Sequence, residues 1–120
     1  MSALLDTSVL SGPGPPPALD QDWAVSVISI GELSAGVLLA PDATTRAARL
    51  RSLTMLVEIA PALPIDTAVA QRFGELRAAS GRRPSNDLWI AATALAHDLT
   101  LVTADRAQST LPLVTAQLVS

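Results

Sequence analysis

The chain has 120 residues, enough for one domain with its own hydrophobic core, and 49% of them are hydrophobic. The absence of cysteine excludes disulfides, thiolate zinc sites and cysteine nucleophiles, and it fits a reducing cytoplasm, where we expect the protein to work. The net charge of −3, from 11 acidic and 8 basic residues, argues at first against a nucleic-acid partner.

The first predicted elements are two short buried strands, residues 3–6 and 24–28, which are rich in apolar and β-branched residues. Between them, residues 11–17 consist almost entirely of glycine and proline and are predicted to form a loop. A helix is predicted to begin near Ser29, because Ser29 and Glu32 have the spacing of a capping box.

Three further helices are predicted. Asp42 is the expected cap of a helix over 43–57, with an apolar stripe. That stripe consists of Ala47, Leu50, Leu53 and Leu56. Asp66 is the expected cap of a helix that closes at Gly81, and residues 85–97 form the next one.

The remaining residues are predicted to form a strand over 99–103, a turn or short helix over 105–110 and an extended segment over 113–119. Strands thus alternate with helices, which predicts a single α/β domain over 1–120. We expect a three-layer α/β/α sandwich with a mainly parallel central sheet of about four to five strands.

One stretch, residues 24–41, is about long enough to cross a bilayer. Its only charge, Glu32, lies near the centre, where an acid costs about 2.5 to 3.5 kcal/mol on insertion. The amino terminus also lacks the basic and long apolar regions of a signal peptide. We therefore expect no membrane span and no secretion.

Four acids lie where an apolar run stops or a helix starts: Asp6, Glu32, Asp87 and Asp105. In parallel α/β sheets, ligands bind beyond the carboxyl ends of the strands, so these acids can converge there. Carboxylates about 4 Å apart repel by about 4 kcal/mol at an effective dielectric of 20, so a cluster needs a cation. Oxygen ligands favour Mg²⁺ or Mn²⁺, and a metal-activated water could then hydrolyse a phosphodiester.

Each acid also has a local alternative. Glu32 could be only half of the capping box, and Asp87 could cap a helix beginning near Leu88. Asp6 could be a solvated strand end, and Asp105 could begin a turn.

The basic residues are all arginine, which binds phosphate with a planar fork. With four acids in a metal site, seven acids remain against eight arginines, so the outer surface is nearly neutral and compatible with RNA. Arg82 and Arg83 precede the helix that carries Asp87, and Arg106 follows Asp105, so all three are candidate RNA-binding residues. A solvated loop is the alternative for the first two.

Four strings of the chain resemble the PIN-domain ribonucleases, particularly the VapC-type toxins of bacterial toxin–antitoxin (VapBC) pairs. They are residues 5–10 (Leu-Asp-Thr-Ser-Val-Leu), 29–36 (Ser-Ile-Gly-Glu-Leu-Ser-Ala-Gly), 86–94 (Asn-Asp-Leu-Trp-Ile-Ala-Ala-Thr-Ala) and 101–106 (Leu-Val-Thr-Ala-Asp-Arg). The resemblance covers nearly the whole chain and implies a PIN-like fold and endoribonuclease activity. It implies metal binding and catalysis by Asp6, Glu32, Asp87 and Asp105. Orienting groups beside the acids would be Thr7, Ser8, Asn86 and Thr103.

The same resemblance implies partners: RNA, a cognate VapB-type antitoxin, and a homodimer, heterotetramer or larger toxin–antitoxin assembly. Two departures from the family support an alternative, a catalytically weak PIN-like interaction module. Residues 10–23 are short and rich in proline, so the first helix is expected to be reduced or missing. After Asp105 the string Arg106-Ala107-Gln108-Ser109 lacks the usual aromatic residue, so a looser loop is expected there.

Overall fold

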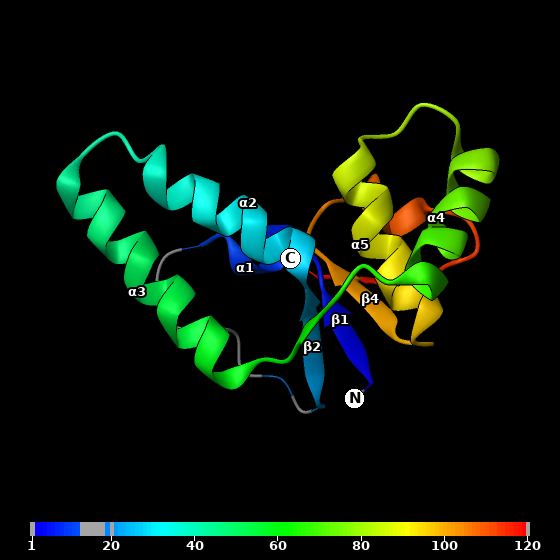
Figure 1. The fold of residues 1–120 in the computed structure, drawn as a ribbon, viewed down its shortest axis with the longest axis horizontal. Coiled ribbons are helices and arrows are strands. Elements are labelled where there is room, and N and C mark those ends of the chain that lie inside the picture. Colours follow the sequence, from blue (N-terminus) through cyan, green and yellow to red (C-terminus); the bar gives the residue numbers. More distant parts are fainter. Residues whose placement is uncertain (1, 13–18, 20, 120) are drawn as a thin grey trace.

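Every strand pairing in the described part of the chain is parallel. The computed structural model describes residues 2–12, 19 and 21–119, and its five strands are arranged in the order β3-β2-β1-β4-β5 (Figure 1). The strands are β1 (Ala3–Leu5), β2 (Trp23–Ser26), β3 (Ala62–Leu63), β4 (Thr100–Thr103) and β5 (Ala116–Leu118). The helices are α1 (Thr7–Leu10), α2 (Val27–Leu38), α3 (Ala43–Ile59), α4 (Thr67–Ser80), α5 (Ser85–Ala96) and the 3-10 helix η1 (Gln108–Thr110). The expected α/β sandwich is confirmed.

The central strand β1 supplies residues to both faces of the sheet, because side chains alternate along a strand. Leu4 pairs with Ala24 of β2 and Leu101 of β4, and all three belong to the core that α4 and α5 cover. On the opposite face, Leu5 pairs with Val102 and packs into a second core to which α3 contributes Leu56 and α1 contributes partly buried residues. Burial on both faces explains why the strands read as continuous apolar runs.

Two of the predicted helix caps are confirmed. Asp42 accepts a hydrogen bond from the Thr45 amide at 2.7 Å, and Asp66 accepts one from the Val69 amide at 3.0 Å. Gly81 ends α4 with a φ of 66°, a conformation that favours glycine.

The predicted start of the α2 helix is wrong by a few residues. The strand expected to reach residue 28 ends at Ser26, and Ser26, not Ser29, is the cap of α2. The Ser26 hydroxyl accepts from the Ile28 amide at 3.1 Å, so the helix starts within the β-branched run that suggested a strand. Ser29 is instead a buried residue inside α2.

The segment between β1 and β2 is described only in part. Of the predicted loop over 11–17, residues 13–17 lie outside the described residues. The helix at its start, α1, has only four residues, which agrees with the expected reduction of the first helix.

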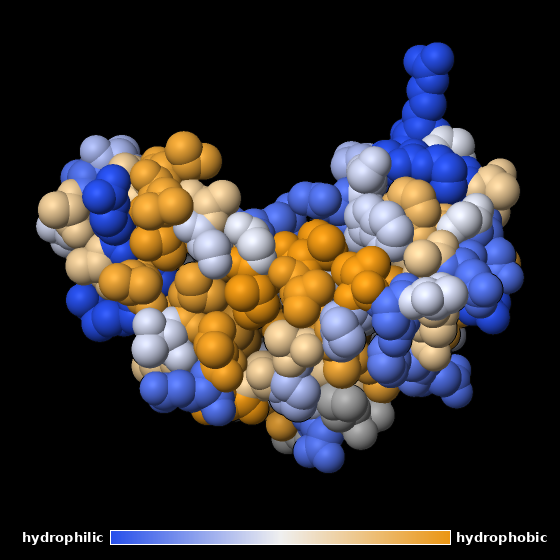
Figure 2. All heavy atoms as spheres, in the orientation of Figure 1, coloured by the Kyte–Doolittle hydropathy of each residue, from blue (hydrophilic) through white to orange (hydrophobic). Residues whose placement is uncertain are grey.

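Helices α2 and α3 form an antiparallel hairpin, the apolar arm, which extends away from the sheet (Figure 1). Several of its apolar side chains are exposed, including Leu38 at 71%, Leu39 at 79% and Leu50 at 51%. The predicted stripe of α3 is therefore only partly buried, with Leu56 in the core and Leu50 at the surface. Figure 2 shows a broad hydrophobic area that continues from the arm toward the centre of the molecule.

No helix in the described ranges is both long and apolar enough to cross a membrane. Residues 24–41, considered as a span, are divided between β2, α2 and the turn that follows.

Candidate metal centre

Asp6 follows β1 directly and is nearly buried, with 5% of its surface exposed. Its Oδ2 accepts hydrogen bonds from the Ser8 hydroxyl at 2.7 Å and the Thr103 hydroxyl at 2.8 Å. Its backbone amide donates to the Val102 carbonyl at 2.8 Å, which fixes it against β4. The alternative of a solvated strand end is wrong, and the two hydroxyls replace part of the hydration that burial removes.

The same hydroxyls connect Asp6 to the loop after β4. Thr103 Oγ1 also accepts from the Asp105 amide at 3.0 Å, and Ser8 Oγ accepts from the Ala104 amide at 2.9 Å. Asp105 Oδ1 accepts from the Ala107 amide at 2.9 Å, so the predicted turn at Asp105 is confirmed. The turn does not exclude a functional role, because it holds an exposed carboxylate beside the Asp6 network.

Glu32 reaches the site from α2. Its Oε1 accepts from the Thr7 hydroxyl at 2.7 Å, and Thr7 Oγ1 lies 2.8 Å from Ser29 Oγ. The capping-box alternative is wrong, because Ser26 occupies the cap position and Glu32 bonds across to α1.

Asp87 is the third residue of α5, so it does not cap a helix beginning near Leu88. Burial is the main cause that raises the pKa of Asp87 above its ordinary value, and the charge of Asp6 is the second. The Arg83 guanidinium lowers this pKa, whereas Asp105 and Glu32 raise it. Asp87 therefore lies in the electrostatic field of the other three acids.

None of these four carboxylates has a cationic partner within salt-bridge distance. The one ion pair among the described residues joins Arg72 and Glu75, both on α4. In the same described ranges, no group of three or more His, Cys, Asp or Glu side chains lies close enough together to hold a metal ion. The four acids thus share an electrostatic environment without forming a coordination shell. Their chemistry, oxygen donors with mutual repulsion, fits a Mg²⁺ or Mn²⁺ ion.

The other predicted site residues divide into two groups. Thr7, Ser8 and Thr103 hydrogen-bond to the acids, whereas Asn86 is exposed and makes no side-chain hydrogen bond within the described residues. Arg82 and Arg106 are likewise exposed.

Sequence reasoning missed two further residues, Ser29 and Gln108. Both are polar but buried, Ser29 beside Thr7 and Gln108 beside Asp87, whose carbonyl accepts from Gln108 Nε2 at 2.8 Å. Their place in the chain gave no signal, because serine and glutamine are usually exposed.

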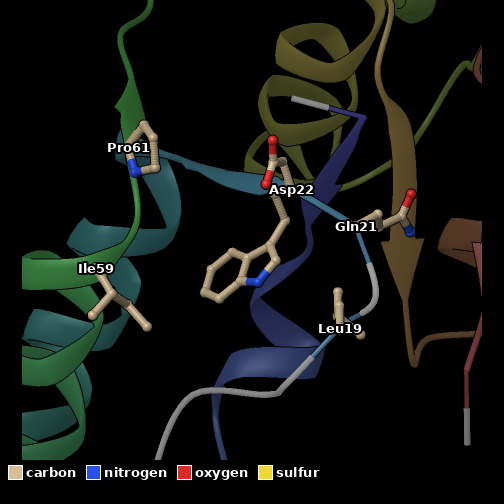
Figure 3. Close-up of a pocket in the computed structure, with 6 residues that line it drawn as sticks. Leu19, Gln21, Asp22, Ile59 and Pro61 are labelled. Atoms are coloured by element: carbon tan, nitrogen blue, oxygen red, sulfur yellow. The ribbon is translucent and has the colours of Figure 1, made fainter.

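The face shown in Figure 2 is hollowed between the apolar arm and the α4–α5 side of the molecule, with hydrophilic atoms on the floor. A different pocket, of about 430 Å³, lies where β2 begins, at the opposite edge of the sheet from the acids (Figure 3). Ile59 and Pro61 line one side of it and Leu19 and Gln21 the other, and none of the four site acids lines it.

Acids near the carboxyl ends of parallel strands are typical of α/β domains that bind a ligand at that end of the sheet. The comparison with known proteins identifies the family. Residues 3–112 match the PIN domain family, and the chain belongs to it. It is 40% identical to Ribonuclease VapC4 of Mycobacterium tuberculosis over 119 residues, covering 92% of this chain and 91% of that protein. It is also 40% identical to Ribonuclease VapC5 of the same organism over 113 residues, covering 87% of this chain and 83% of that protein.

Among solved structures, the chain is similar to the toxin–antitoxin complex VapBC-5 from Mycobacterium tuberculosis, a member of the VapBC family. The TM-score is 0.79 and the sequence identity 33%, over 98% of each chain. The resemblance noted in the sequence is confirmed.

Proposed function

We propose that this protein is a Mg²⁺- or Mn²⁺-dependent endoribonuclease and the toxin of a type II toxin–antitoxin pair. The observation that carries the proposal is that Asp6, Glu32, Asp87 and Asp105 share one electrostatic environment and that none of the four has a cationic partner within salt-bridge distance. The relatives named ribonucleases support RNA as the substrate.

A bound Mg²⁺ or Mn²⁺ would neutralise the acids and activate water for attack on a phosphodiester. The chain's contribution is to hold the ligands. Asp6 is fixed by Ser8 and Thr103, and Glu32 by Thr7, so these two carboxylates are oriented before any ion arrives. Asp87 and Asp105 complete the donor set from α5 and from the loop after β4.

RNA would be held mainly through its phosphates. Arg82 and Arg106 are exposed next to the segments that carry Asp87 and Asp105, and Arg83 lies in the field of Asp87. The protein has 2% aromatic residues, too few for a platform on which bases stack.

The proposed partner is a VapB-type antitoxin. The exposed hydrophobic residues of the apolar arm support it, because exposed apolar patches mark interaction sites, and VapBC-5 is a toxin–antitoxin system. The assembly proposed is a homodimer, a heterotetramer or a larger complex. Size-exclusion chromatography after co-expression with a small DNA-binding protein encoded directly upstream tests this proposal.

The nuclease proposal is tested by cleavage of structured RNA with manganese and with a chelator, using wild type and Asp6→Asn. We expect cleavage only with manganese and a loss of at least about 100-fold in Asp6→Asn, because a metal ligand is removed. Asp98→Asn is the matched control: Asp98 is exposed with a φ of 55°, a conformation that asparagine tolerates. Equal cleavage in the chelator would refute the proposal.

A second candidate function is the catalytically weak PIN-like interaction module. It is favoured by the spacing of the acids, since no three of the described acidic side chains form a group ready to hold an ion. Such a module would gain no stability from manganese, whereas the nuclease would.

A further inference from the structure

Gln108, the first residue of η1, carries a primary amide with 1% of the residue exposed. A buried amide is unfavourable unless its donors and acceptor find partners, so its contacts define what it does.

The nitrogen and the oxygen of this amide each form a hydrogen bond with another residue. Nε2 donates to the Asp87 carbonyl at 2.8 Å, and Oε1 accepts from Arg83 Nη2 at 3.2 Å. Only this orientation of the amide satisfies both partners, because a carbonyl can only accept and a guanidinium can only donate.

We infer that Gln108 is a positioning residue of the metal centre, which joins the first turn of α5 to the turn after β4 and holds the Arg83 guanidinium between them. The inference rests on the proposed nuclease function. Asp87 lies on the first of these segments, and Asp105 begins the second, where its carbonyl accepts from the Ser109 amide at 3.1 Å. Gln108 thus connects the backbone that carries Asp87 with the turn that Asp105 begins.

The segment before α5 is held by a second contact. Arg77 donates to the carbonyls of Gly81 at 2.8 Å and Arg83 at 2.9 Å, so the backbone at Arg83 is fixed from α4. Within the described residues, the Nε of Arg83 is buried without a partner, and the bond to Gln108 is the one hydrogen bond that this guanidinium makes. Arg83 is therefore held in place where its charge lowers the pKa of Asp87, whereas Arg82 is exposed.

The experiment compares Gln108→Met, which keeps the side-chain size and removes both hydrogen bonds, with Gln71→Met, the same change at an exposed position on α4. Manganese affinity is measured by electron paramagnetic resonance of the free ion, at a temperature at which circular dichroism shows each variant folded. We expect Gln108→Met to bind manganese about tenfold more weakly than wild type and Gln71→Met to bind it equally well. A lower Tm with unchanged manganese affinity would show a purely structural role and overturn the inference.

A second measurement on the wild-type protein applies even if Gln108→Met does not fold. In an NMR titration with Mg²⁺, the side-chain amide signals of Gln108 should shift together with the Asp87 backbone amide, while those of Gln71 and Gln117 stay fixed. Unmoved Gln108 signals beside a shifting Asp87 amide would overturn the positioning role alone. A wild-type protein that binds neither ion would overturn the proposed function and this inference together.

Discussion

The two sides of the acidic edge are built differently. Asp6, at the end of β1, is nearly buried and accepts hydrogen bonds from two hydroxyls, whereas Asp87, on α5, has a pKa raised by burial and by the other acids. Hydrogen bonds from the protein stabilise the charge of Asp6. The charge of Asp87 is stabilised by Arg83, and a bound cation would stabilise it further. If the protein is the proposed metal-dependent nuclease, Asp6 is a ligand that the chain orients in advance, and Asp87 supplies a repulsion that a bound metal would relieve.

The largest expected effect is stabilisation by manganese. At a manganese concentration about 100 times the dissociation constant, wild type should gain about 2.7 kcal/mol in the free energy of unfolding. Asp6→Asn should lose this gain entirely, because the oriented ligand is gone, and Asp87→Asn should lose it in part. Thermal unfolding with and without a chelator measures the gain, with NaCl at matched ionic strength as the control for screening. Equal losses in the two variants would contradict the difference between the two sides.

A smaller effect on stability is expected when Asp6 loses one of its two hydroxyl donors. Thr103→Val keeps the shape of a fully buried side chain but removes the hydroxyl that donates to Asp6 and accepts from the Asp105 amide. Because the Asp6 carboxylate and the Asp105 amide then each lose a hydrogen bond, we expect a loss of about 1 to 2 kcal/mol in the free energy of unfolding measured with denaturant. Thr115→Val, at an exposed position, is the control and should stay within about 0.5 kcal/mol of wild type. Unchanged stability in Thr103→Val would show that the hydroxyl network contributes little.

The smallest effect concerns the charge of Asp87. Because its pKa in the folded protein is raised above 3.8, the folded state binds this proton more tightly than the unfolded state. Its contribution to stability is present below the unfolded pKa and is lost as pH rises through the folded pKa. Asp87→Asn should therefore raise the Tm at neutral pH by about 2 °C, a small value because the carboxyl is partly screened by solvent.

The control for this pH dependence is the same pair of proteins at lower pH. The difference in Tm should shrink as pH falls toward 3.8, where the wild-type carboxyl is protonated too. A constant difference across the pH range would contradict repulsion among the acids as its cause.

Much of the fold was predictable, because its signals are local. Asp42 and Asp66 each act as caps within three residues of their own position, so the sequence alone reveals them. The start of α2 was misplaced because Val27 and Ile28 favour a strand by propensity, and the Ser26 cap overrides that preference.

The acids of the candidate site could be predicted from the sequence, but the buried residue that hydrogen-bonds beside them, Gln108, could not. The acids stand at element ends, where a parallel sheet gathers its ligands, so their positions could be read from the chain. Gln108 gave no such signal, because a polar residue in a turn looks like a surface residue until its partners from α5 are in place. The exposure of the apolar arm could not be predicted either, because periodicity marks an apolar face of a helix and does not say what covers that face.

The position of β1 in the middle of the sheet has a consequence for synthesis on the ribosome. Asp6 is made 97 residues before Thr103, one of its two hydroxyl donors, and β4 must be made before it can pair with β1. A nascent chain therefore carries Asp6 without the complete hydroxyl network that orients it until β4 has been made. If the protein is the proposed ribonuclease, it stays inactive toward the messenger and the ribosome that make it until β4 has left the ribosome.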